Sequence, residues 1–174
     1  MSEFLLHRRQ VIAAAVAGLS MFDLPILSAS EDPFKGLPIG IQTFSLRGYN
    51  LLETIRHIQG MGLHFVEFYP DHVPQAIDEE GLRNLNQLLN KAEIKMAAHG
   101  VWSFNNDHEF NKSIFDFAKR LGVKCLTANP SPDSFESLDK LVEQYKIRVA
   151  IHNHGPDALY DKISSVVEAV KDHH

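Results

Sequence analysis

The sequence predicts an α/β fold, a partial (β/α) barrel of about five βα units, and three observations carry this prediction. Five short apolar segments each precede an amphipathic helical pattern, as parallel strands joined by crossover helices require. A polar residue lies at the end of each predicted strand, where α/β barrels place their active sites. The loop after the first strand lacks the glycine-rich phosphate-binding pattern of an open dinucleotide-binding sheet.

The first two units follow from apolar strands and from helix caps. Residues 39–45 form the first predicted strand, and Asn50 with Glu53 has the pattern of a capping box that begins a helix. Residues 65–69 form the second strand. Asp78 is then expected to cap a second helix. The leucines predicted to face inward from that helix are Leu82, Leu85, Leu88 and Leu89.

The last three units repeat the same pattern. Their predicted strands are residues 94–99, 124–128 and 148–153. Their helices begin at about Asp107, with Phe110 on the apolar stripe, at a second capping-box pattern formed by Asp133 and Glu136, and after Asp157. The apolar residues of the last helix are Tyr160, Ile163, Val166, Val167 and Val170.

Polar side chains at the strand ends predict a site at the barrel mouth. These residues are Gln42, Glu67, His99, Thr127, Asn129, His152, Asn153 and His154. His152 and His154 are two positions apart, so in a strand they point to the same side. Glu67 lies among apolar residues and needs a partner, because burying an unpaired carboxylate is costly. Three nearby aromatic residues, expected mainly to fill space between strands and helices, are Phe44, Trp102 and Phe104.

The first 29 residues are predicted to be an export signal rather than part of the fold. Arg8 and Arg9 precede the apolar residues 11–19, a pattern that favours the bacterial twin-arginine route and delivery to the periplasm. Asp23 and Pro25 interrupt the apolar run, so we expect no lasting membrane span. The predicted domain covers residues 30–174.

Composition and length set further bounds. The net charge of −5 argues against a nucleic-acid partner bound by a broad basic surface. Cys125 is the single cysteine, so no intrachain disulfide forms, and we interpret it as a small buried side chain. Eight barrel units take about 250 residues, so three units are missing here. We therefore expect either a fragment of a longer chain or self-association through the open sheet edges.

Several short segments together resemble the sugar phosphate isomerase/epimerase family, which has the xylose isomerase-like TIM barrel. They are residues 40–45, residues 62–69 with the central Glu67, residues 98–100 and residues 118–126. The resemblance runs in register from about Ile39 to the C-terminus and covers the first five of eight units.

This resemblance implies isomerisation or epimerisation of a sugar or polyol, with a divalent ion (Mn, Zn, Mg or Co) at the mouth. His152 stands where the family often has a metal-binding Glu, whereas Asn153 and His154 match the family pattern. The other family ligands come from later strands. The strand ends place these residues at the mouth, and the resemblance implies catalysis by Glu67 and His99, substrate contact by Gln42, His99, Asn153 and His154, and metal ligation by His152 and His154.

Two functional hypotheses lead for this chain, and a third, a metal-dependent abasic-site nuclease, is opposed by the predicted export and by the acidic charge. The first is a sugar isomerase or epimerase whose intact form acts on a small-molecule sugar and which the missing units impair here. The second is a non-catalytic remnant or sugar-binding module, which the missing ligands and the Glu-to-His change favour.

Overall fold

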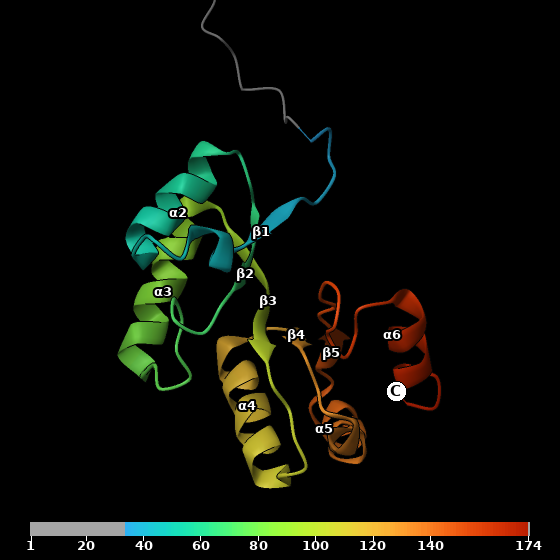
Figure 1. The fold of residues 1–174 in the computed structure, drawn as a ribbon. Coiled ribbons are helices and arrows are strands. Elements are labelled where there is room, and N and C mark those ends of the chain that lie inside the picture. Colours follow the sequence, from blue (N-terminus) through green and yellow to red (C-terminus); the bar gives the residue numbers. More distant parts are fainter. Residues whose placement is uncertain (1–33, 174) are drawn as a thin grey trace, which may run out of the picture. The chain divides into compact units, whose positions relative to one another are not determined.

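The computed structural model describes residues 34–173, of which those from Gly36 onward form one compact unit. Its sheet has five parallel strands in the order β1-β2-β3-β4-β5 (Figure 1). The strands are β1 (Gly40–Gln42), β2 (Phe65–Phe68), β3 (Lys95–Trp102), β4 (Cys125–Ala128) and β5 (Arg148–Ile151). The predicted α/β class and the five parallel units are therefore confirmed. The predicted signal at residues 1–29 lies outside the described residues, and export to the periplasm stays a prediction.

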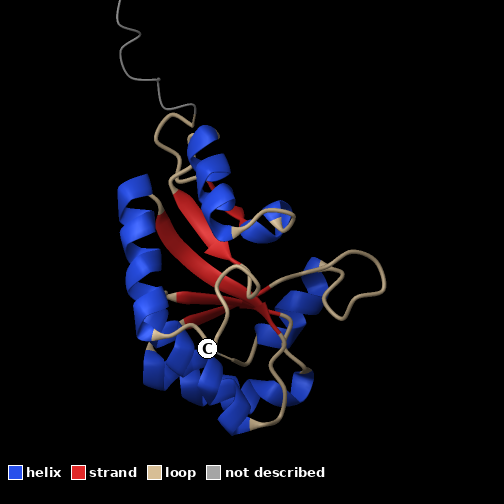
Figure 2. Ribbon diagram, turned by 90° about the vertical axis from the view of Figure 1, so that its left-hand side faces the viewer, coloured by secondary structure: helices blue, strands red, loops and turns tan. Residues whose placement is uncertain are grey.

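Four helices connect successive strands along one side of the sheet, and a fifth helix follows the last strand (Figure 2). They are α2 (Leu51–Gly60), α3 (Glu79–Ala92), α4 (His108–Leu121), α5 (Phe135–Tyr145) and α6 (Ile163–Val170), with two short 3-10 helices, η1 (Thr43–Leu46) and η2 (Pro132–Ser134). Between sheet and helices lies a core of fully buried side chains. Its largest members include Phe68, Phe104, Phe115, Phe117, Ile55, Ile58, Ile114, Leu126 and Leu141.

The predicted caps of the first helices are confirmed. The Asn50 side chain accepts the Glu53 N–H at 3.0 Å, and the Glu53 carboxylate accepts the Asn50 N–H at 3.1 Å. Asp78 caps α3 by accepting the Gly81 N–H at 2.7 Å. These bonds satisfy amide groups that a helix leaves unpaired at its start, so they fix where each strand-to-helix loop ends.

Several local predictions differ from the structure. The first strand ends at Gln42, because the chain turns into η1 there. The predicted capping box at Asp133 is absent: Pro132 begins η2, the Ser131 hydroxyl donates to the Asp133 carboxylate, and α5 starts at Phe135 without a side-chain cap. Phe110 on α4 is 40% exposed rather than inward-facing.

The last helix begins at Ile163, later than predicted. Tyr160 is buried in the preceding turn, where its hydroxyl donates to the Pro130 carbonyl at 2.7 Å. The apolar residues Ile163, Val167 and Val170 of α6 are 82%, 57% and 40% exposed. These exposed apolar side chains and the unpaired edge strands β1 and β5 are surfaces through which two copies could associate. Self-association itself stays a prediction. None of the helices among residues 34–173 is long and apolar enough to cross a bilayer.

An extra residue in β3 decides which side chains face which layer. Val66 pairs with Met96, but Glu67 pairs with Ala98, so Ala97 is inserted into the strand. Because side chains alternate along a strand, an inserted residue reverses the alternation beyond it. His99 consequently pairs with Phe68 and lies in the layer beneath the helices, whereas the uninterrupted pattern would direct it to the opposite, inner face.

We predict that Gly100→Ala destabilises the fold strongly, by about 1–3 kcal/mol, because overpacking displaces well-packed neighbours. A Cβ built at Gly100 would lie 2.2 Å from Thr127 Oγ1 and 2.3 Å from the Thr127 carbonyl oxygen. Gly60→Ala is the matched control, since a Cβ there meets no atom within 4 Å. Urea unfolding of both variants provides the measurement. Equal stability of the Gly100→Ala and wild-type proteins would contradict the observed close approach.

Candidate functional site at the carboxyl ends of the strands

A pocket of about 300 Å³ opens where the strands end. The residues that line it are Gln42, Phe44, Tyr69, Pro70, Val101, His152 and His154. They come from the ends of β1, β2, β3 and β5 and from the loops that follow, so the parallel arrangement brings together residues far apart in the sequence. Three of the predicted site residues, Gln42, His152 and His154, therefore share one mouth pocket.

The two histidines lie just beyond β5, which ends at Ile151 rather than at residue 153. The His152 N–H donates to the Ala128 carbonyl at 2.7 Å and continues the pairing with β4, while the His154 N–H donates to the Tyr160 carbonyl at 3.2 Å. The ring centroids of His152 and His154 are 5.0 Å apart. Backbone bonds thus hold both imidazoles at the pocket wall.

Phe44 and Tyr69 form an aromatic wall of the pocket. Their rings meet edge to face with centroids 5.6 Å apart, and the Arg47 guanidinium lies 4.5 Å from the Phe44 centroid. Partial burial, followed by the neighbouring Asp71 carboxylate, raises the pKa of the Tyr69 hydroxyl. Tyr69 was not among the predicted site residues, although its position directly after the second strand was a signal for it. Phe44, expected mainly as filling, is 50% exposed.

Glu67 lies on the inner face of the sheet, and its carboxylate has the hydrogen-bond partners that a carboxylate among apolar residues needs. Its Oε1 accepts the Gln42 Nε2–H at 2.8 Å and the Thr127 hydroxyl at 2.5 Å. Glu67 and Gln42 also line a second hollow, of about 370 Å³, on the inner face of β1, β2 and β3. Gln42 therefore joins this hollow to the mouth pocket, while Glu67 lines only the former.

The structure does not bring His99 to the mouth. Its side chain is fully buried in the core, with Nε2 2.9 Å from the Val73 carbonyl and Nδ1 3.1 Å from Trp102 Nε1. A carbonyl only accepts and an indole only donates, so His99 is neutral, with its proton on Nε2. Both ring nitrogens are thus occupied by protein groups. His99 therefore has no free ring nitrogen with which to contact a substrate or transfer a proton at the mouth. The cause is the inserted Ala97, which reverses the strand alternation.

His99 makes a testable contribution to the pH dependence of stability. Burial lowers the pKa of His99 below its ordinary value of about 6.5. In the window between the lowered pKa and about 6.5, the unfolded chain therefore binds more protons than the folded one. The contribution of neutral His99 to the free energy of unfolding is therefore fully present above about pH 6.5 and is lost as the pH falls toward the lowered pKa.

We predict that His99→Leu lowers the free energy of unfolding by about 1–3 kcal/mol at pH 7.5, because it orphans the Val73 and Trp102 groups. His99→Asn is the matched control, since its amide both donates and accepts but does not titrate in this range. It should show a weaker loss of stability between pH 7.5 and 5 than the wild type. Urea titrations followed by the fluorescence of the single tryptophan would measure this. Identical pH profiles of wild type and His99→Asn would refute the assignment.

Two other residues lie outside the mouth pocket. Asn153 is exposed and does not line the pocket, so its predicted contact with substrate has no geometric support here. Cys125 is half-buried, and burial raises the pKa of its thiol, which opposes formation of a nucleophilic thiolate. Its interpretation as a small packing residue agrees with this environment.

A divalent ion at the mouth would have to be held by the side chains that line the pocket. His152 and His154 are chemically suited to Zn or Mn, and their rings are close. Within the described part of the chain, however, no group of three or more His, Cys, Asp or Glu side chains is arranged to hold a metal ion. The residues at the mouth therefore do not form a complete metal site by themselves.

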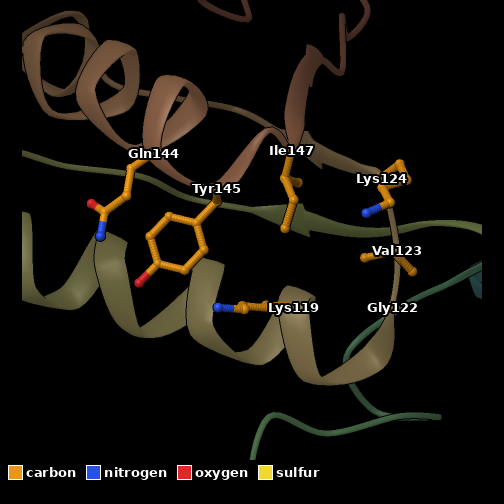
Figure 3. A pocket seen from close by; sticks show the side chains of 7 residues that line it. All are labelled: Lys119, Gly122, Val123, Lys124, Gln144, Tyr145 and Ile147. Atoms are coloured by element: carbon orange, nitrogen blue, oxygen red, sulfur yellow. The ribbon is translucent and has the colours of Figure 1, made fainter.

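A third pocket, of about 300 Å³, lies between the end of α4, the loop into β4 and the end of α5 (Figure 3). Its lining includes Lys119, Lys124 and Tyr145, with the Lys119 ammonium 6.0 Å from the Tyr145 ring centroid. It is built from helix-to-strand connections, at the opposite end of the strands from the mouth. Lysines near a helix C-terminus are expected there because they offset the helix dipole.

Comparison with known proteins identifies the fold. No protein-family model matches the chain, and no curated protein matches it. Among solved structures, an uncharacterized protein from Parabacteroides distasonis matches 78% of this chain, with 25% identity and a TM-score of 0.64. A xylose isomerase domain-containing protein from Salmonella typhimurium matches 76% with 14% identity and a TM-score of 0.58. A xylose isomerase domain protein from Alicyclobacillus acidocaldarius matches 76% with 15% identity and a TM-score of 0.57.

These matches show that the chain has the fold of xylose isomerase-like TIM barrel domains, in partial form. It spans 58%, 57% and 59% of the three matched chains. The predicted fold class is confirmed. At such identities the likeness shows the fold, and function has to be argued from the site.

Proposed function

We propose that the mouth pocket binds a sugar or polyol, and that the chain supplies this pocket to an isomerase- or epimerase-like barrel. The observation that carries the proposal is the convergence of Gln42, His152 and His154 with two aromatic rings in one pocket at the carboxyl end of the sheet. In α/β barrels, this end of the sheet carries the active site.

The pocket chemistry suits a polyhydroxylated ligand. The Phe44 and Tyr69 rings provide an apolar wall for the C–H face of a sugar, while the amide and the imidazoles offer hydrogen bonds to hydroxyl groups. Isomerisation or epimerisation moves a proton at a carbon beside a carbonyl, and an imidazole can take up and return a proton. When no ion occupies them, His152 and His154 are therefore the proposed proton-handling groups of this chain.

A divalent ion (Mn, Zn, Mg or Co), where bound, would polarise the carbonyl of the sugar as a Lewis acid. His152 and His154 could supply two ligands, and the further ligands would have to come from outside the described residues. No step of the proposal depends on this ion.

A non-catalytic sugar-binding module is the second candidate. The observation that favours it is the incomplete ligand set, since two imidazoles are the only His, Cys, Asp or Glu side chains among the described residues that line the pocket. This candidate predicts sugar binding without turnover, whereas the first predicts proton exchange at the carbon next to the carbonyl in the bound sugar.

Binding should be measurable by NMR titration with D-xylose and xylitol. We expect His154→Ala and Phe44→Ala each to weaken binding by at least about threefold, because each removes one wall of the pocket. Phe110→Ala is the matched control: this ring is similarly exposed but lies on α4, outside the pocket. Equal affinity in all three variants would place the sugar elsewhere, and absence of saturable binding would overturn the proposal.

Metal binding has a separate readout in thermal unfolding. If the two imidazoles bind Zn²⁺, the ion should raise the melting temperature of the folded chain by mass action. His154→Ala should abolish this shift and His152→Ala should weaken it, since His154 is the more exposed of the two and is readily reached. A shift that survives His154→Ala would show that the ion binds at another place, and no shift in the wild type would show that the two imidazoles do not bind Zn²⁺ without further ligands.

A further inference from the structure

We infer that Thr127 and Glu67 hold the Gln42 amide with its carbonyl oxygen toward the mouth pocket, so that the pocket selects a neutral hydroxyl donor over an anion. This inference rests on the proposed function and adds the substrate class to it. It assigns Glu67 and Thr127 as positioning residues that act through Gln42.

The chemistry of the partners fixes which way the amide faces. A carboxylate can only accept hydrogen bonds, so Gln42 must present its NH₂ group to Glu67, at 2.8 Å. The Thr127 hydroxyl must donate to the same oxygen, Oε1, at 2.5 Å. With the NH₂ group committed to Glu67, the opposite end of the Gln42 amide is its carbonyl oxygen.

That oxygen is open to ligand. The Glu67 contact is the one hydrogen bond found for the Gln42 side chain within residues 34–173. Nor is Gln42 Oε1 a buried orphan, because in the same part of the chain the only buried side-chain nitrogen or oxygen without a partner is His72 Nδ1. Gln42 lines both the mouth pocket and the inner hollow, and we infer that its free acceptor faces the mouth because its NH₂ group is turned to Glu67, which lines only the hollow.

The contact between Glu67 and Thr127 crosses an entire strand, which shows that it is built into the fold. β3 lies between β2 and β4, and a side chain on β3 at this level would block the path. The residue there is Gly100, where an added Cβ would lie 2.2 Å from Thr127 Oγ1. The missing side chain lets Thr127 reach Glu67 and hold its carboxylate in place.

The charge around the pocket also favours a neutral ligand. None of the seven lining residues is Lys or Arg, and the nearby Arg47 already donates to the Phe44 carbonyl at 3.0 Å. The Glu67 carboxylate lies directly behind Gln42, so an anion at this position would face both a carbonyl dipole and a like charge. A ligand hydroxyl, in contrast, donates to the Gln42 oxygen without penalty.

The amide orientation can be tested without any ligand. In ¹⁵N-labelled full-length protein, the Gln42 side-chain NH₂ should give two resolved resonances shifted from free-amide values by the bond to Glu67. Thr127→Val, which keeps the side-chain shape but removes the donor, should move these resonances toward free values. Thr127→Ser should restore the wild-type pattern. Unchanged resonances in Thr127→Val would overturn the positioning role of Thr127, and free-amide values in the wild type would overturn the whole chain of contacts.

Ligand selectivity provides the second readout, with xylitol and inorganic phosphate as probes. We expect xylitol to shift the Gln42 NH₂ resonances and phosphate to leave them unchanged. Thr127→Val should weaken xylitol binding about three- to tenfold, whereas Thr127→Ser should not. Phosphate binding at Gln42 in the wild type would overturn the selectivity for neutral ligands. If neither probe binds, the proposed sugar-binding function fails, while the ligand-free spectra still decide the orientation of the amide.

Discussion

The insertion of Ala97 into β3, the first of two register shifts in that strand, is the constraint on which the arrangement of the site depends. From Ala98 up to a second register shift between His99 and Trp102, the side chains of β3 face the opposite side of the sheet from the one that an uninterrupted strand would give them. His99 enters the core beneath the helices, and Gly100 comes to the inner face opposite Thr127. One insertion thus removes an imidazole from the mouth and clears the path between Glu67 and Thr127.

As a result, the two faces of the sheet carry side chains with different roles. On the helix side, His99 satisfies a carbonyl and an indole and stabilises the packing, and burial lowers its pKa accordingly. On the inner side, the Glu67 carboxylate accepts hydrogen bonds from Gln42 and Thr127 and lines the inner hollow. Two titratable side chains that look equivalent as strand-end residues in the sequence therefore have different physical roles.

Local signals were sufficient to predict most of the fold, because caps and apolar periodicity are encoded by nearby residues. The capping box of Asn50 and the Asp78 cap are examples. The insertion at Ala97 has no such signal, since it is visible only in the pairing of β3 with β2, and His99 was consequently assigned to the mouth. The late start of α6 likewise depends on a long-range bond, from Tyr160 to the Pro130 carbonyl.

The mouth pocket, rather than likeness of fold, carries the functional proposal, because one barrel fold serves many reactions. His152 and His154 reached the mouth as predicted, since the end of a parallel strand fixes the side from which its loop departs. By their chemistry alone, these imidazoles could bind a metal ion, transfer a proton or form a hydrogen bond with a ligand hydroxyl. What narrows the choice is the neighbouring Gln42, whose free acceptor is set by a carboxylate that can only accept. The proposed specificity of this pocket would therefore originate in Glu67 and Thr127, one residue layer below the surface that a ligand would touch.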